Sequence, residues 1–545
     1  MSEARISHGF GPLTSLYEAV ARTGGLTGML FAALLGAFAA LGFAPFHLSP
    51  TLAIAFIGLV WMLDGARGHK RWGRSMFARG WAFGFGFFLV GMYWTAQPFL
   101  VEPERHAIFL WMPLIALPGG MALIWGAACA LGGAFWSSSP SRVFIFALFM
   151  GLAELARGHL FGGFPWNLAG TTWTPGAPLS QAASLGGVYW LTLVTLLIMA
   201  APATLVDTRA QKGVLLRAVP SVLAIALLAF GWAWGSQRLA TDTELTERSV
   251  ILIDAGVPQA EKFENPQQVL ARYSEFLREI PSEPGDILIW PEGALPSYLL
   301  QDTVALDQIS GFLGPRTLIT GTPRVSTTSG AANYYNSVAV FQTGALSTEL
   351  VALYDKHRLV PFGELAATRI VPFGESISGI LPSAIQRMAR SGFTPGAGPT
   401  VLYPETLPAF IPLICYEGLF PEMLRKADPR PENAEWIVVV SNDAWFGGGM
   451  GPAQHYNQNR YRAIESGLPM ARVATRGTTA MIDGYGRELA RGNPVAGDPA
   501  GWRSSVVRTA LPAKLDRTPY QRFGGTFYWL SLVVCLILAF ACWRR

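Results

Sequence analysis

Residues 410–418 read Phe-Ile-Pro-Leu-Ile-Cys-Tyr-Glu-Gly, a short apolar run that ends at Cys415. Such a run is typical of a strand covered on both faces of its sheet. Similar runs lie before and after it, at 250–253, 287–290, 317–320, 338–341 and 436–440. Apparent helices intervene, at 266–279 and 457–467. The alternation predicts a layered α/β or α+β sandwich, and argues against an all-β domain.

The rest of the chain is much more apolar than this region. The 545 residues are 51% hydrophobic and only 14% charged, whereas soluble chains are about 25% charged. This composition excludes a wholly soluble enzyme, a disordered protein and a nucleic-acid binder with broad basic surfaces. It predicts a polytopic helical membrane bundle of about eight spans joined to the sandwich. The expected spans are 26–44, 50–64, 80–98, 108–136, 143–158, 186–206, 218–235 and 526–543.

Charge between the spans predicts their orientation, although the net charge is only +5. Short basic connections stay in the cytoplasm, and three basic groups occur, whereas 102–104 is acidic. The basic residues are Arg67, Lys70, Arg71, Arg74 and Arg79, then Arg209, Lys212 and Arg217, then Arg544 and Arg545. The run 108–136 is either one helix kinked at Pro113 and Pro118 or a helix plus a re-entrant piece. All three basic groups lie in the cytoplasm only if this run crosses the membrane once. Both termini are then cytoplasmic, and the chain divides into 1–236, an outward domain 237–522, and 523–545.

Two features inside the expected bundle admit two interpretations each. Gly80 and Gly84 form a GxxxG pair, which favours close helix packing, with a groove for a lipid chain as the alternative. Glu154 and Arg157 are three residues apart near the outer end of a span. With Phe164-Pro165-Trp166 they either hold a phospholipid headgroup or form an ion pair at the membrane interface.

The position of the cysteines is the sharpest clue to chemistry. Cys129, Cys535 and Cys542 fall in expected spans, and Cys415 alone lies in the outward domain. Four cysteines in so long a chain do not make a disulfide framework. A lone thiol at a strand end is either a nucleophile or an inert core residue, and Cys415 by itself leaves both open.

A cysteine nucleophile needs a base and a group that stabilises an oxyanion. Glu292 follows an apolar strand directly, in Trp290-Pro291-Glu292-Gly293, and Lys356 lies in Tyr354-Asp355-Lys356-His357. Each alone is weak, because exposed Glu and Lys are common. The order Glu, Lys, Cys at strand ends is more specific.

The motifs that carry this order are WPEGALP at 290–296, DKHRLVPFGE at 355–364 and LICYEGLFPE at 413–422. They resemble the nitrilase, or carbon–nitrogen hydrolase, superfamily. Flanking spans and four further motifs resemble the apolipoprotein N-acyltransferase family in particular. These motifs are GFAPFHLSP at 42–50, GWAFGFGFFLVGMYW at 80–94, ARGHLFGGFPWNLAG at 156–170 and SNDAWFGGGMGPAQH at 441–455.

The resemblance implies a role for each matching residue. Cys415 is the implied nucleophile, Glu292 the general base and acid, and Lys356 the cation that stabilises the oxyanion. The implied supporting residues are Glu364, Tyr416 and Glu417, and the candidate substrate-binding residues are Asn336, Phe263, Trp445, Glu154 and Arg157. His455 also matches a family motif, without an assigned role. Phe263 and Arg476 replace residues usual in the family, and Glu364 is preferred over Glu375 of the repeated Val-Pro-Phe-Gly-Glu at 371–375.

The resemblance also implies an αββα sandwich facing the periplasm from a bacterial inner membrane. The implied reaction passes a fatty acyl chain from a phospholipid, through a Cys415 thioester, to the N-terminal amine of a diacylglyceryl-cysteine apolipoprotein. The alternatives are a membrane-tethered amidase or nitrilase that uses water, and a non-catalytic transporter or receptor. We expect a monomer with no cofactor, no metal and no nucleic-acid partner, since no His spacing or nucleotide motif indicates one.

Overall fold

A computed structural model provides the structure of the chain. It divides the chain into two compact units. The first, here called the helical unit, comprises Met1–Gly158, Pro165–Arg238 and Phe523–Arg545; the second, the sandwich unit, comprises His159–Phe164 and Leu239–Arg522. The residues that the structure describes are 11–101, 103–206, 214–281, 283–327, 332–344, 347–361, 363–364, 392–493 and 501–543.

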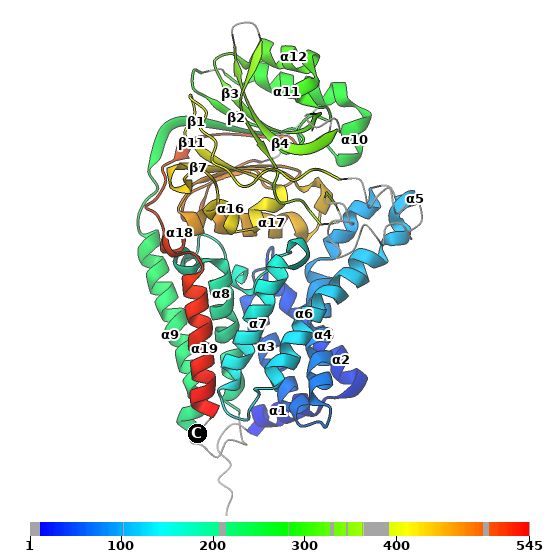
Figure 1. The fold of residues 1–545 in the computed structure, drawn as a ribbon, viewed down its shortest axis with the longest axis vertical. Helices are drawn as coiled ribbons and strands as arrows, with labels where there is room; N and C mark the ends of the chain where they lie inside the picture. Colours follow the sequence, from blue (N-terminus) through cyan, green and yellow to red (C-terminus); the bar gives the residue numbers. More distant parts are fainter. Residues whose placement is uncertain are drawn as a thin grey trace, which may run out of the picture. The chain divides into compact units, whose positions relative to one another are not determined.

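The helical unit consists of long apolar helices that run side by side (Figure 1). Its main helices are α1 Gly11–Arg22, α2 Gly25–Ala39, α3 Ser49–Arg67, α4 Trp72–Gly91, α6 Leu117–Gly133, α7 Arg142–His159, α8 Ala183–Ala200, α9 Val214–Leu239 and α19 Thr526–Trp543. Among the described residues, six helices are long and apolar enough to cross a membrane. A seventh span results if α4 and the bent turn Tyr93–Leu100 count together, and Thr526–Phe540 is a shorter apolar helix.

Each of the eight expected apolar spans is helical in the structure. The expected 108–136 segment is continuous, because residues Ala107–Gly133 form one helical stretch of 27 residues. The turn Met112–Ala116, which contains Pro113, is wound as a π-helix. This widened turn accommodates prolines that would otherwise break the hydrogen-bond ladder.

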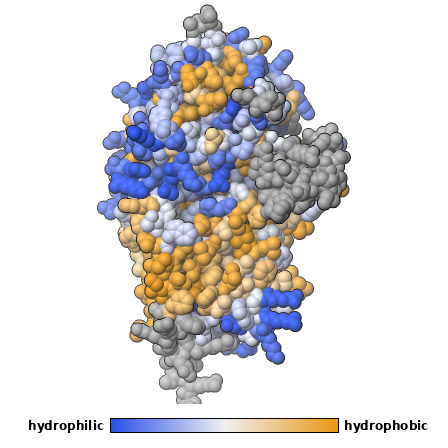
Figure 2. Space-filling view, in the orientation of Figure 1, coloured by the Kyte–Doolittle hydropathy of each residue, from blue (hydrophilic) through white to orange (hydrophobic). Residues whose placement is uncertain are grey.

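Small residues let the helices of this unit approach closely. A Cβ on Gly80 would lie 2.6 Å from Sγ of Cys129 in α6, and one on Gly36 would lie 1.9 Å from the carbonyl oxygen of Phe83 in α4. The GxxxG pair therefore serves helix packing, as the first of its two interpretations expects. Large apolar side chains instead face outward (Figure 2), such as Leu34 of α2, Ile225 of α9 and Ile537 of α19.

The sandwich unit contains two mixed β-sheets. The first has the strand order β11-β1-β2-β3-β4-β5 and the second β10-β9-β8-β7-β6. Strands β1, β2 and β3 are parallel to one another, as are β6, β7 and β8. The strands are β1 Leu245–Asp254, β2 Ile287–Ile289, β3 Thr317–Ser326, β4 Asn333–Thr343, β5 Thr348–Asp355, β6 Phe410–Ile414, β7 Trp436–Asn442, β8 Met470–Thr475, β9 Ala480–Ile482, β10 Glu488–Arg491 and β11 Ser505–Pro512.

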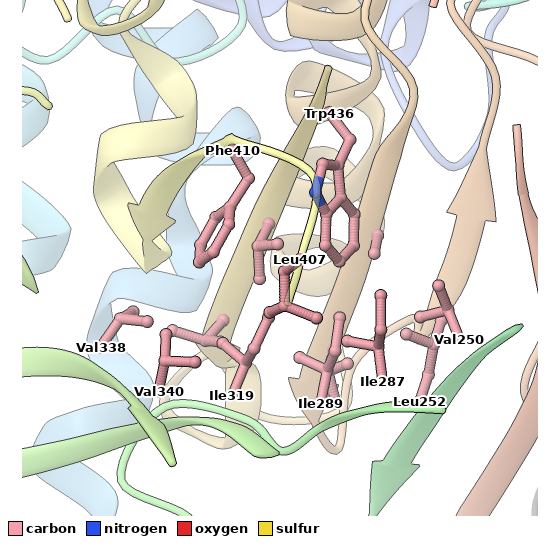
Figure 3. Packing of buried hydrophobic residues seen from close by; sticks show 14 of the residues in the cluster. Val250, Leu252, Ile287, Ile289, Ile319, Val338, Val340, Leu407, Phe410 and Trp436 are labelled. Carbon is pink, nitrogen blue, oxygen red and sulfur yellow. The ribbon is translucent and has the colours of Figure 1, made fainter. Parts of the chain in front are cut away.

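Two apolar layers hold this unit together. Between the sheets, Phe410 and Trp436 face Val338, Val340 and Ile319 (Figure 3). A second layer joins the other face of the first sheet to helices α11 Pro266–Glu279 and α12 Thr303–Leu313. Helix α17 Met450–Ser466 contacts the turns that follow β6 and β7. Each fully buried aliphatic side chain here contributes about 1.5–3 kcal/mol. The expected αββα sandwich is confirmed.

Candidate active site

Glu292 lies just past the end of β2, in the turn after Pro291. One carboxylate oxygen accepts the side-chain amide of Asn336 at 2.7 Å, and the other accepts the backbone N–H of Asn442 at 2.8 Å. Asn336 belongs to the first sheet and Asn442 ends β7 of the second. Glu292 thus links the ends of the two sheets, and its two oxygens are fixed in direction.

Lys356 follows β5 directly and is 1% exposed. Its backbone N–H donates to the carbonyl of Asn336 at 2.8 Å. The ammonium contacts Glu364 at 2.8 Å and Glu292 at 3.4 Å. The Asn336 amide also donates to Glu364, at 3.0 Å. The structure therefore brings Glu292, Lys356, Glu364 and Asn336 into one connected group.

Cys415 follows β6 directly and begins a tight helical turn, Cys415–Leu419. Its φ is +50°, a left-handed conformation that costs a non-glycine residue about 1–3 kcal/mol. The thiol interacts electrostatically with both Glu292 and Lys356. Because the residue is 9% exposed, the thiol is nearly closed off from solvent, and its charged neighbours are a carboxylate and an ammonium.

The carboxylate of Glu417 holds this strained turn in place by accepting hydrogen bonds at both of its oxygens. One oxygen accepts the N–H of Ile414 at 2.9 Å, and the other accepts the hydroxyl of Tyr354 at 2.7 Å and the N–H groups of His357 and Arg358 at 2.8 and 3.0 Å. Glu417 therefore ties the turn Cys415–Leu419 to the segment that carries Lys356. Both oxygens of Glu417 already accept hydrogen bonds, which indicates a positioning role. Burial raises the pKa of this carboxyl.

A second buried network, formed by His455, Asp443 and Arg472, also contacts this turn. The His455 ring lies 3.1 Å from the carbonyl oxygen of Cys415 through Nε2 and 3.0 Å from Asp443 through Nδ1. Arg472 donates to Asp443 at 2.8 Å. All three side chains are fully buried. His455, which had no assigned role, therefore holds the backbone of Cys415 in place.

Burial and charge set the protonation of the two central groups. Burial raises the pKa of the Cys415 thiol well above its usual range, and the Glu292 carboxylate raises it further, against the opposing effect of Lys356. Burial alone would lower the pKa of Lys356, but Glu364 and Glu292 outweigh it and raise that pKa. The resting site thus contains a neutral thiol and a permanent ammonium, so the thiol needs a base to become a nucleophile.

Tyr416 contacts the short segment His159–Phe164, which belongs to the sandwich unit. Its hydroxyl donates to the carbonyl oxygen of Gly163, and its ring lies 6.1 Å from that of Phe164. Arg358 donates to the carbonyl of Gly162 at 3.2 Å. Tyr416 therefore anchors a segment that borders the turn Cys415–Leu419.

The contacts described above involve none of the remaining candidate residues. Phe263 is 66% exposed and Trp445 40% exposed, so both are open to solvent. In the helical unit, Glu154 and Arg157 are buried and paired, with Nε of Arg157 2.9 Å from the carboxylate, which also accepts the Trp125 indole at 2.7 Å. Arg157 also donates to the carbonyl of Trp166 at 2.8 Å. These contacts favour the ion-pair interpretation; headgroup binding stays a prediction. Glu375 lies outside the described residues.

Three residues around Glu292 were not assigned from the sequence: Asn442, Gln259 and Lys262. Asn442 lies in the quoted motif at 441–455, and its position at the end of β7 was the available signal. Gln259 accepts the Asn442 side-chain amide at 2.9 Å. Lys262 is 4% exposed and interacts electrostatically with Glu292. Among the described residues, no cluster of three or more His, Cys, Asp or Glu side chains has metal-binding geometry.

The sandwich fold with a Glu, Lys and Cys at its strand ends defines a carbon–nitrogen hydrolase domain. The family model for "Carbon-nitrogen hydrolase" matches residues 255–497, and "Apolipoprotein N-acyltransferase N-terminal domain" matches residues 35–201. Apolipoprotein N-acyltransferase of Caulobacter vibrioides is 38% identical over 93% of each chain. That of Rhodopseudomonas palustris is 33% identical over 97% of this chain and 98% of its own. The chain therefore belongs to the apolipoprotein N-acyltransferase family.

Among solved structures, an amidase from Nesterenkonia sp. is similar over 49% of this chain and 91% of its own, with 18% identity and a TM-score of 0.32. Family membership and the apolar helices of the first unit together make the chain a bacterial membrane protein.

Substitution of Gly321 by alanine is expected to lower acylation of Cys415 about 10²-fold, because a misplacement near 1 Å has that effect. A Cβ on Gly321 of β3 would lie 2.5 Å from Cα of Glu292 and 3.0 Å from N of Gly293. The backbone that carries Glu292 must therefore move. The matched control is Gly311→Ala in α12, where nothing lies within 4 Å. Equal acylation rates in the two folded variants, measured by single-turnover mass spectrometry, would contradict this geometry.

Proposed function

We propose that Glu292, Lys356 and Cys415 form the catalytic triad of a phospholipid-dependent acyltransferase. The acceptor is the N-terminal amine of an apolipoprotein whose first residue is a diacylglyceryl-cysteine. One observation carries the proposal: in a member of this family, a buried thiol interacts electrostatically with a carboxylate and an ammonium that lie 3.4 Å apart.

In the first half-reaction, Glu292 takes the thiol proton, and Sγ of Cys415 attacks an ester carbonyl carbon of the phospholipid. The Lys356 ammonium stabilises the negative oxygen of the tetrahedral intermediate. The carbon–oxygen bond to the glycerol then breaks, and the glycerol oxygen receives the proton from Glu292. A lysophospholipid leaves and a thioester remains on Cys415.

In the second half-reaction, the α-amine of the acceptor attacks the thioester carbonyl, and Lys356 again stabilises the oxyanion. Glu292 takes a proton from the attacking amine. The carbon–sulfur bond breaks, and Glu292 returns a proton to the sulfur, so that an amide and the free thiol result. Glu364 and Asn336 keep the ammonium and the base in place.

Both substrates are anchored in lipid, which accounts for a catalytic unit linked to apolar helices. We place the protein in the bacterial inner membrane as a monomer, with the sandwich unit in the periplasm and both termini in the cytoplasm. The basic connection with Arg67, Lys70 and Arg71 supports this orientation.

The test uses the full-length protein in detergent with a phospholipid and a synthetic diacylglyceryl-cysteine peptide. Mass spectrometry should detect the peptide with one added acyl chain and an equal amount of lysophospholipid. Free fatty acid with an unmodified peptide would indicate instead a hydrolase that uses water. Binding of lipid without any covalent product would indicate a non-catalytic protein.

A further inference from the structure

The catalytic group has a second buried lysine beside it that the mechanism above does not use. Lys262 belongs to the short helix α10 Gln259–Glu264 and is 4% exposed. Lysine is almost never buried to this extent unless its charge is balanced. None of the described residues accepts a hydrogen bond from its ammonium. Nearby negative charges must therefore compensate for the burial of the Lys262 ammonium.

The ammonium of Lys262 lies next to the backbone that carries the base. Its Nζ is 3.5 Å from the position that a Cβ on Gly293 would occupy, and Gly293 follows Glu292 directly. Gln259 of the same helix binds the Asn442 side chain at 2.9 Å, and the N–H of Asn442 binds Glu292 at 2.8 Å. Helix α10 thus places two side chains, Gln259 and Lys262, near Glu292.

The charges of Lys356, Glu292 and Glu364 do not balance, which suggests a role for the ammonium of Lys262. Lys356 contacts two carboxylates, Glu292 and Glu364, so these three side chains carry two negative charges and one positive charge. The two carboxylates are only 12% and 16% exposed, so a net negative charge there is poorly screened by water and is stabilised by a nearby cation. Lys262 is attracted to Glu292 and supplies the missing positive charge.

The other charged groups around Lys262 are few among the described residues. Asp254, at the end of β1, also attracts it and accepts N–H groups from Gly256 at 2.8 Å and Arg476 at 3.2 Å. Arg476 faces Asp254, and Tyr273 of α11 interacts with the same carboxyl. Burial lowers the pKa of Lys262 to about 8, while Glu292 and Asp254 oppose that fall; burial raises the pKa of Asp254 to about 7.

We propose that Lys262 is a positioning residue whose buried ammonium, together with Lys356, keeps Glu292 in the charged form that accepts the Cys415 proton. The proposal rests on the proposed function, because it assigns a role in the same proton transfer. The alternative is that Lys262 is a structural lysine paired with Asp254. Only the positioning role would change how the acylation rate depends on pH.

The experiment measures single-turnover acylation of Cys415 by phospholipid in the full-length protein, without acceptor, from pH 5 to pH 10. In Lys262→Met, which keeps the length of the side chain and removes its charge, the acidic limb of the rate profile should move to higher pH by about one unit. Lys262→Arg should restore the acidic limb and hold the rate above pH 8, where the wild-type ammonium loses its proton. Lys514→Met is the matched control, because Lys514 binds only the carbonyl of Ala434 among the described residues, at 3.4 Å.

Superimposable profiles for wild type and a folded Lys262→Met would overturn the proposal and leave the acyltransferase function intact. Failure of the wild type to acylate Cys415 at any pH would instead overturn the function. If Lys262→Met does not fold, Lys262→Arg decides: a basic limb unchanged from wild type contradicts the proposal, and an extension to higher pH supports it.

Discussion

Cys415→Ala is expected to lose at least about 10⁴-fold in acyl transfer, because removing a covalent nucleophile leaves only the binding and electrostatic contributions. The sulfur is the atom that carries the acyl chain between the two substrates, and no other described thiol lies in the sandwich unit. The measurement is the initial rate of N-acylated peptide formation, with the fold checked by thermal unfolding in the same detergent.

Cys535→Ala is the control for this result. Cys535 lies in α19 of the helical unit and is 5% exposed, so the same chemical change occurs at a buried thiol outside the proposed site. It should keep wild-type activity. Substantial activity in Cys415→Ala would show that the thiol is an inert core residue, the interpretation that the sequence alone left open.

Glu292→Gln should slow acylation of Cys415 by about 10²–10⁴-fold, the usual contribution of general acid–base catalysis. Glutamine has the same shape and can still accept the N–H of Asn442 through its carbonyl oxygen. It has no capacity to take the thiol proton. Because burial raises the pKa of the thiol, little thiolate forms without this base. Loss of rate with an unchanged fold is therefore attributable to proton transfer.

Glu283→Gln is the matched control, since the side chain of Glu283 is 69% exposed and only weakly paired with Arg508, at 3.9 Å. We expect its acylation rate to equal that of the wild type. If Glu292→Gln retained more than about a tenth of the wild-type rate, below the 10²–10⁴-fold loss expected of an essential base, another group would have to be the base. Glu364, which contacts the same ammonium, would then be the next residue to test.

Two of the three proposed catalytic residues could be placed from the sequence because each follows a recognisable apolar strand. Glu292 and Cys415 come directly after the apolar strands β2 and β6, whose burial leaves a continuous apolar signal. Lys356 was located by motif order, since β5 itself was not predicted. That strand has mixed burial and contains Glu349, so its pattern resembles a surface segment.

Strand β8 was missed for a different physical reason. Strand β8 is buried throughout, but Arg472 and Thr475 interrupt its apolar run. The charge of Arg472 is balanced by Asp443, which lies 29 residues earlier in the chain. Partners so distant in sequence become visible only when the fold brings them together. The contacts of His455 and the buried position of Lys262 were therefore not predictable from local pattern.

The most direct test of the account is the mass of the peptide containing Cys415 after incubation of the full-length protein with phospholipid alone. We expect Cys415 to gain the mass of one acyl chain, which neutral hydroxylamine removes as it removes a thioester. The same chain should pass to a diacylglyceryl-cysteine peptide added afterwards. An unmodified Cys415 in protein that still produces N-acylated peptide would contradict it.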